Sequence, residues 1–253
     1  MIELSITGDV AEVVLNAPEK LNALSLRALG EMDAAYRSAE ESGVRALLLR
    51  AEGRAFCAGR DIAGVDPETD DVPEYLAGVE TLMRRIAAFP APTFAAVHGA
   101  CLGVGLGLAI ATDVVYVADD AKIGSPFASL GAMLDSGGHA LLYERLGAHR
   151  ALDLIYTGDM LSGAEAVAAG LFSRAMPVEE VFDFAWQRAV VAASGPTAAF
   201  LASKRVIARL RDERLWDAVA EEARGQEALR LTADYREGFA AFQQKRPPEF
   251  TGR

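Results

Sequence analysis

Apolar and polar residues alternate over the first fifteen positions of the chain. The stretches IELSIT and AEVVLN are each typical of a short strand, and Gly8-Asp9 between them is a two-residue hairpin signal. After Pro18 the apolar spacing changes to three and four, and Ser25 stands where it can cap a helix that ends near Gly43. The pattern therefore predicts a hairpin followed by a helix.

Three later segments, RALLLR, TFAAV and DVVYVA, are apolar runs of strand length. Such runs are typical of strands that are covered on both faces, and each leads into a turn or a helix. A glycine-rich loop from Gly53 to Gly64 follows the first of them. This alternation predicts an α/β fold for the first half of the chain.

Helical patterns rich in Ala, Arg and Glu replace the strand signal from about Val178 onward. Breaks are expected at Gly195-Pro196 and around Gly225. We therefore expect a core of residues 1–195 and a C-terminal helical region of residues 196–253.

Acidic residues dominate the charge of the chain. Its 36 Asp and Glu against 25 Lys and Arg give a formal charge of −11, and no run of basic residues offers a path for nucleic-acid phosphates. The acidic stretch DPETDD, which begins at Asp66, is expected to form a mobile surface loop whose carboxylates repel one another and bury nothing. No nucleic-acid partner is expected.

The first residues, the short apolar stretches and the cysteine spacing favour a cytoplasmic protein. The first residues lack the features of a signal peptide, and the longest apolar stretches, such as residues 104–111, fall far short of the roughly 20 residues of a membrane span. Cys57 and Cys101 are isolated, and the three histidines form no ligand cluster. We expect no membrane association and no metal.

Three common motifs are missing. No serine is flanked by glycines as a GxSxG nucleophile elbow requires, and the phosphate-binding GxxxxGK[ST] pattern does not occur. The dinucleotide pattern GxGxxG fails because Leu108 stands where its last glycine is needed. Serine hydrolase and nucleotide-binding functions are therefore disfavoured.

Two glycine-rich segments remain, AFCAGRDI at residues 55–62 and HGACLGVGLGLA at residues 98–109, each directly after an apolar strand. Small residues let a ligand approach the backbone, and the first N–H groups of a helix are unpaired and partly positive. Two converging N–H donors would form an oxyanion hole for a carbonyl oxygen. The alternative is that these glycines only permit tight turns and close helix packing.

These segments resemble the crotonase, or enoyl-CoA hydratase/isomerase, superfamily. The likeness also includes PEKLNALS, the continuation IATDVVYVADDAKIG, the block TGDMLSGAEAVAAGL and the terminal FQQKRPPEFTG, so it spans essentially the whole chain. The resemblance implies a spiral of ββα units and a C-terminal helical region that builds homotrimers, commonly paired into hexamers. It also implies an acyl-CoA thioester as the substrate, with no separate cofactor.

Matched by position, the resemblance assigns site residues. The oxyanion donors are expected to be the main-chain N–H groups of Arg60 and Val104. The branched side chain of Val104 must either point away from the thioester or narrow the pocket. Residues expected to contact CoA are Lys20, Leu21, Ala23, Ala58, Arg60, Asp61, Ile62, Phe242 and Lys245, the last two reaching a neighbouring subunit's ligand. The acyl pocket is expected to be lined by Gly103, Gly107, Phe127 and Leu134.

The sequence departs from the hydratases of this family, which carry two glutamates for handling water. Gly107 and Phe127 stand at the matching positions, and neither can transfer a proton, so hydration is not expected. Asp135 matches the aspartate of several isomerases and the nucleophile of aromatic acyl-CoA dehalogenases. A single acid of raised pKa is enough for a 1,3-proton shift, so an isomerase is the predicted function.

Other interpretations stay open. Asp135 precedes Ser-Gly-Gly and an apolar helical pattern, as a helix cap would, and the protein could bind acyl-CoA without turning it over. A dehalogenase would need a further base, for which Glu80 or a histidine is a candidate. Phe127 could be an acyl-pocket wall or plain core. Within the family, the single aspartate and the C-terminal stretch most resemble the phenylacetate-pathway 1,2-epoxyphenylacetyl-CoA and Δ3,Δ2-enoyl-CoA isomerases.

Overall fold

A six-stranded sheet forms the centre of the protein. The computed structural model describes the backbone of residues 1–253 and every side chain except that of Glu213. Strands β1 (Ile2–Thr7) and β2 (Val10–Leu15) form the predicted hairpin, with Thr7 opposite Val10 across the Gly8-Asp9 turn. The other strands run parallel in the order β2, β3 (Ala46–Ala51), β4 (Thr93–Val97), β6 (Val114–Ala118) and β9 (Arg174–Met176).

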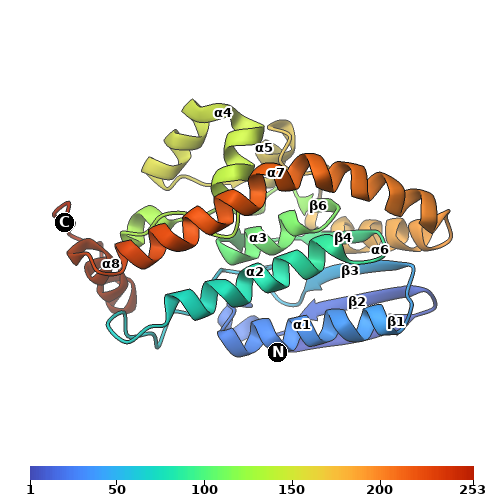
Figure 1. Cartoon of the computed structure of the whole chain (residues 1–253), viewed down its shortest axis with the longest axis horizontal. Helices are drawn as coiled ribbons and strands as arrows, with labels where there is room; N and C mark the ends of the chain where they lie inside the picture. Colours follow the sequence, from blue (N-terminus) through green and yellow to red (C-terminus); the bar gives the residue numbers. More distant parts are fainter.

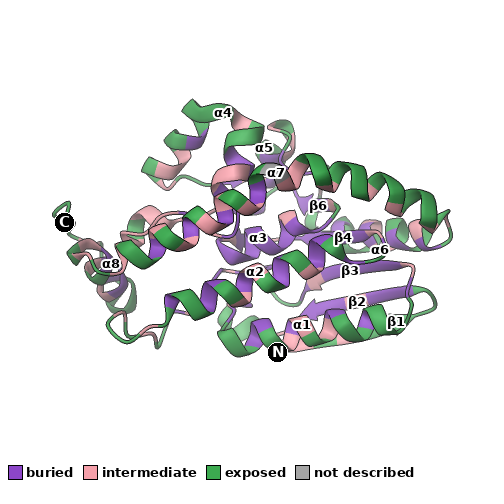
Figure 2. Ribbon diagram, in the orientation of Figure 1, coloured by how far each residue is buried: buried purple, intermediate pink, exposed green. Residues whose placement is uncertain are grey.

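The apolar strands are covered on both faces, as their sequences predict. Leu47, Leu48 and Leu49 of β3 are all fully buried although successive side chains point to opposite faces of a sheet. Helix α6 (Val178–Ala193) packs on β2, β3, β4 and β6, and α1 (Leu26–Glu41) packs on the hairpin. Figure 2 shows the purple core along these strands and the green outer faces of the helices.

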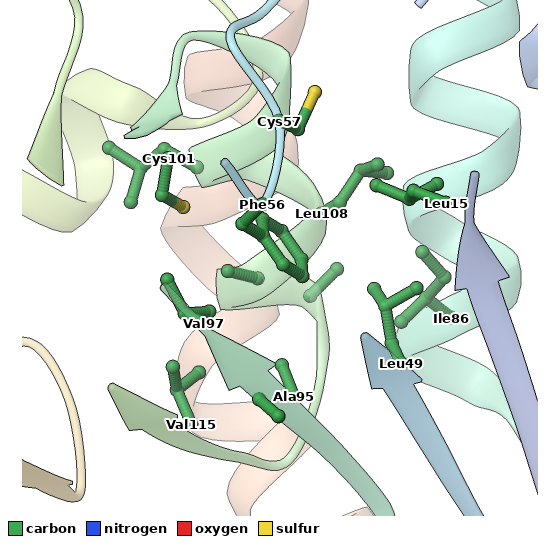
Figure 3. Packing of buried hydrophobic residues seen from close by; sticks show 14 of the residues in the cluster. Leu15, Leu49, Phe56, Cys57, Ile86, Ala95, Val97, Cys101, Leu108 and Val115 are labelled. Carbon is green, nitrogen blue, oxygen red and sulfur yellow. The ribbon is translucent and has the colours of Figure 1, made fainter. Parts of the chain in front are cut away.

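Helix α1 begins where the sequence predicts. The Ser25 hydroxyl accepts a hydrogen bond from the N–H of Ala28, and the helix ends two residues before Gly43. The predicted glycine-rich loop joins β3 to α2 (Val72–Ala88), which packs against α1 and α3 (Val104–Ala111). Figure 3 shows Leu108 of α3 and Ile86 of α2 in the shared core, beside the loop residues Phe56 and Cys57.

A small second sheet carries the turn into α3. It consists of β5 (Ala100–Leu102), β7 (Lys122–Gly124) and β8 (Leu161–Ser162), with β7 in the middle. The short helices in this half are η1 (Pro18–Lys20), η2 (Phe127–Leu130) and α5 (Gly163–Ala168). Because β5 ends one residue before Gly103, this sheet fixes the start of α3.

The C-terminal helices lie across the molecule rather than apart from it. Helix α7 (Thr197–Leu229) runs alongside α2 and contacts α4 (Gly138–Thr157), and α8 (Ala233–Gln244) packs on η2 (Figure 1). The predicted break at Gly195-Pro196 is confirmed, because α6 and α7 meet there. No helix among the described residues is both long and apolar enough to cross a membrane.

Two local predictions are wrong. Gly225 does not interrupt α7, which continues to Leu229; the glycine instead lets the helix approach Met133, whose sulfur fills the space of a side chain there. The acidic stretch forms a loop, but Asp70 is not left in solvent. Its side chain is 8% exposed and pairs with Arg60, so one carboxylate of the cluster is packed against the candidate site.

Candidate functional site

The two glycine-rich segments lie side by side. A parallel bridge joins Cys57 to Cys101, with the Cys57 N–H donating to Ala100 and the Leu102 N–H donating to Cys57. Two residues further along, Gly59 and Gly103 are still in contact, and Arg60 and Val104 directly follow them in the two segments. The contact is close, since a Cβ built on Gly103 would lie 3.9 Å from the Cα of Gly59.

The N–H groups of Arg60 and Val104 are both available to a ligand. A second parallel bridge joins Leu24 to Arg60, but its hydrogen bonds use the Gly59 carbonyl and the Asp61 N–H, so the Arg60 N–H faces the other way. Val104 is the first residue of α3, where an N–H has no acceptor within the helix. Both predicted donors thus have free N–H groups and directly follow the contact between Gly59 and Gly103.

The side chain of Val104 is buried. It is 2% exposed and belongs to the hydrophobic core. Gly103 has a φ of 52°, a conformation that favours glycine, and the ring of Phe127 lies 3.4 Å from where its Cβ would stand. Phe127 is therefore partly buried against the turn that carries the Val104 donor.

Asp135 directly precedes a residue that packs on helix α3. Its neighbour Ser136 packs on Gly107, which donates its own N–H to the Gly103 carbonyl in the first turn of α3. Asp135 is partly buried, and the Ser136 hydroxyl donates to its Oδ1 at 2.7 Å. Asp135 is therefore tied, through Ser136, to the helix that begins with the Val104 donor.

Burial raises the pKa of Asp135 to about 7. The hydrogen bond from Ser136 lowers this pKa, the negative charge of Glu222 raises it, and the positive charges of Arg60 and His139 lower it. A carboxyl group that titrates near neutral pH can both accept and return a proton under ordinary conditions.

Asp135 does not cap α4. That helix has Gly137 at its N-cap, and the buried carboxylate of Glu222, on α7, accepts hydrogen bonds from the N–H groups of Gly137 at 2.7 Å and His139 at 2.9 Å. The His139 Nδ1 also lies 2.9 Å from Glu222. The capping interpretation of Asp135 is therefore wrong, because Glu222 binds the N–H groups at the start of α4.

Comparisons with known proteins show the family of this chain. Residues 5–253 match the family model described as enoyl-CoA hydratase/isomerase. The chain belongs to this family. A probable enoyl-CoA hydratase from Rhodobacter capsulatus is 38% identical over 258 residues, covering 100% of this chain and 98% of that protein.

Two further relatives extend the family comparison. The 1,2-epoxyphenylacetyl-CoA isomerase of Escherichia coli is 35% identical over 251 residues, covering 96% of this chain and 95% of that protein. A crystal structure of an enoyl-CoA hydratase from Mycobacterium avium subsp. paratuberculosis superimposes with a TM-score of 0.89 at 31% identity, covering 99% and 98% of the two chains. The fold is the crotonase fold that the sequence resemblance implies.

The two N-terminal segments that hold most of the predicted CoA contacts touch each other. Lys20 is exposed and pairs with Asp61 at 2.9 Å, while the Leu21 carbonyl accepts from the N–H of Ala58. Ala23 directly precedes the bridge to Arg60. These contacts join the 18–25 segment of the family to its 55–62 segment.

Helix α8 packs against the end of the glycine-rich loop, at Ile62 and Val65. Ile62 is buried with Tyr235 and Phe239 of α8, and the amide of Gln243 donates to the Val65 carbonyl at 2.7 Å. Phe242 and Lys245, at the end of α8, are exposed. Their predicted contact with a neighbouring subunit's ligand stays a prediction for this family member.

Two cavities lie beside rather than at the proposed donors. Leu134 is fully enclosed and lines a space of about 20 Å³ with Leu106 and Leu142. A larger groove of about 1000 Å³ runs between α4 and α7 and reaches His139, but none of the predicted site residues lines it. We therefore place the site by its amides and its acid, not by the size of this groove.

Several residues around the site were missed by the sequence analysis. The Arg60 guanidinium stacks over the ring of Tyr75 at 4.1 Å and pairs with Asp70, so both residues hold the arginine side chain in place. Ser136 adjoins Asp135 in the sequence, and that adjacency was the available signal for it. Glu222 carries no signal, because it lies in a run of ordinary helix-forming residues.

Proposed function

We propose that this protein is an acyl-CoA isomerase that moves a proton between carbons of an enoyl thioester, with Asp135 as its acid and base. The observation that carries the proposal is one carboxyl group of raised pKa whose neighbour Ser136 packs on Gly107, in the helix that begins with the available N–H of Val104. Gly107 and Phe127 stand at the positions where the family's hydratases carry glutamates. A water molecule therefore lacks the two groups that would activate it and protonate the product.

The reaction begins with a 3-enoyl-CoA whose thioester oxygen accepts hydrogen bonds from the N–H groups of Arg60 and Val104. The Asp135 carboxylate removes a proton from the α-carbon, and the electron pair moves onto the thioester oxygen to give a dienolate. The two donors stabilise this negative charge, and each is worth about 3–4 kcal/mol of barrier. Protonated Asp135 then returns the proton two carbons along, which gives the 2-enoyl-CoA.

The surroundings suit a CoA thioester. Lys20 offers an exposed cation for phosphate in a protein of net charge −11, and Phe127 offers an apolar wall for the acyl group. The relationship to the isomerase of Escherichia coli supports a ring-epoxide thioester as a further substrate. As in the family, we propose an assembly of trimers or paired trimers.

A panel of acyl-CoA thioesters followed by mass spectrometry tests this function. We expect conversion of a 3-enoyl-CoA to the 2-enoyl isomer and negligible hydration of crotonyl-CoA. Hydration at a rate typical of the family would overturn the proposal. Binding of several thioesters without turnover would instead favour a carrier, and halide release from a haloaryl-CoA would favour the dehalogenase chemistry.

A further inference from the structure

Ser136 adopts a backbone conformation that serine rarely takes. Its φ is 56°, in the left-handed region, and the residue is 4% exposed. Glycine reaches this conformation without the steric cost that a Cβ imposes. A serine at such a position indicates that its side chain has a role that offsets the strain.

The side chain is held between an acid and a glycine. Its hydroxyl donates to the Oδ1 atom of Asp135 at 2.7 Å. On the other side, a Cβ added to Gly107 would lie 2.5 Å from the Ser136 Cβ and 3.3 Å from its Oγ. Any side chain at position 107 would therefore displace the serine. Ser136 packs directly on the backbone of Gly107.

We propose that Ser136 is a positioning residue for Asp135, its hydroxyl fixing Oδ1 so that Oδ2 is left to exchange the proton with the substrate. This inference rests on the proposed function. Gly107 then has two roles. It stands where the hydratases carry a glutamate, and its lack of a side chain makes room for the serine that orients Asp135.

Other ionisable groups face Asp135 from the elements around it, but they act at longer range. Among the described side chains, Ser136 is the only one that hydrogen-bonds to the Asp135 carboxylate. The others that sense its charge or influence it are Glu222 of α7, Arg60 of the glycine-rich loop, His139 of α4, Tyr75 of α2 and Tyr235 of α8. Local orientation of the carboxylate therefore depends on Ser136.

The test compares Ser136→Ala and Ser136→Gly with the unaltered protein. The glycine variant relieves the backbone strain, so it is expected to fold even where the alanine variant does not. Because the hydroxyl stabilises the carboxylate form, its loss should move the acidic limb of the kcat/KM profile for a 3-enoyl-CoA upward by about 1 pH unit. Above that limb, kcat should fall about 10-fold while KM stays within about 2-fold, an effect of lost orientation. Ser136→Cys, a weak donor, should restore part of both changes.

A second readout does not depend on turnover. The infrared band of the protonated Asp135 carboxyl, identified by its loss in Asp135→Asn, should persist to higher pH in Ser136→Gly than in the unaltered protein. Profiles and bands that superimpose on those of the unaltered protein would overturn the positioning role. If the protein isomerises nothing but the band still shifts, the proposed function fails while the contact between Ser136 and Asp135 stands.

Discussion

The two halves of the candidate site are held in place by different means. The amide half, residues 55–62 and 98–104, is fixed by neighbouring backbone: a parallel bridge at Cys57 and Cys101, and a second one at Leu24 and Arg60. The acid half, residues 131–139, has no such ladder. It is held by side chains from α7, where Glu222 binds Gly137 and His139 and Gln226 donates to the Met133 carbonyl at 2.6 Å.

This difference predicts that the two halves respond differently to substitution. A main-chain N–H is kept whichever side chain the residue carries, proline excepted. The acid half instead depends on particular residues far along the chain, so substitutions in α7 can move or retune Asp135 without touching the amides. We expect specificity within the family to be set in this half.

Removing one amide should have the largest effect. Val104→Pro deletes the N–H at the first position of α3, where proline fits a helix. We expect kcat for isomerisation to fall about 10²–10³-fold, because one oxyanion donor is lost. Val104→Ala keeps the N–H and serves as the control for lost side-chain volume. Equal kcat values for the proline and alanine variants would show that this N–H does not contact the thioester.

Disturbing the support of the acid half should come next. Glu222→Gln replaces one carboxylate oxygen by an NH₂ group. This NH₂ group then faces one of the groups that hydrogen-bond to Glu222 in the unaltered protein. Because a buried donor is then left without an acceptor, we expect the free energy of unfolding to drop by about 2–3 kcal/mol in urea titrations. Isomerisation should weaken with it.

The matched control is Glu221→Gln on the same helix, whose side chain is 73% exposed. Its stability should change by less than about 0.5 kcal/mol. Were the two variants equally stable, α7 would not be the element that holds the acid half.

The raised pKa of Asp135 predicts a smaller, pH-dependent change in stability. In the folded protein this carboxyl binds its proton more tightly than in the unfolded chain, so stability from it is present at low pH and is lost as pH rises from about 3.8 to about 7. Asp135→Asn has no such loss. The variant should therefore be more stable than the unaltered protein by about 1–2 kcal/mol at pH 8, since each pKa unit corresponds to roughly 1.4 kcal/mol and solvent access reduces the full value.

Denaturant titrations at several pH values measure this difference directly. The advantage of the asparagine variant should shrink as pH falls toward 4. A constant difference between pH 4 and pH 8 would mean that the carboxyl titrates at its ordinary value.

The sequence predicts the amide half well because its determinants are local. Apolar strand runs, the Ser25 cap and the glycines at positions 59 and 103 each act on their own neighbourhood, and the family resemblance supplies the order in which they come together. The break assigned to Gly225 was wrong because a glycine's meaning there depends on Met133, over ninety residues away in the chain.

The acid half was predictable only in part. Asp135 could be singled out by its position in the family pattern. The residue that caps α4 is Glu222 instead, and nothing in a helix-forming run marks the one glutamate that will be buried. Asp70 likewise looked like one member of a repelling acidic cluster. Its pairing with Arg60 becomes visible only when the fold brings the two side chains together.

The most direct measurement compares turnover of a 3-enoyl-CoA by Asp135→Asn and by the unaltered protein at pH 8, with thioester affinity measured on both. If Asp135 moves the proton while the main-chain N–H groups of residues 60 and 104 hold the thioester, isomerisation should fall at least about 10²–10⁴-fold and Kd should stay within a few-fold. Undiminished isomerisation by the asparagine variant would contradict the account.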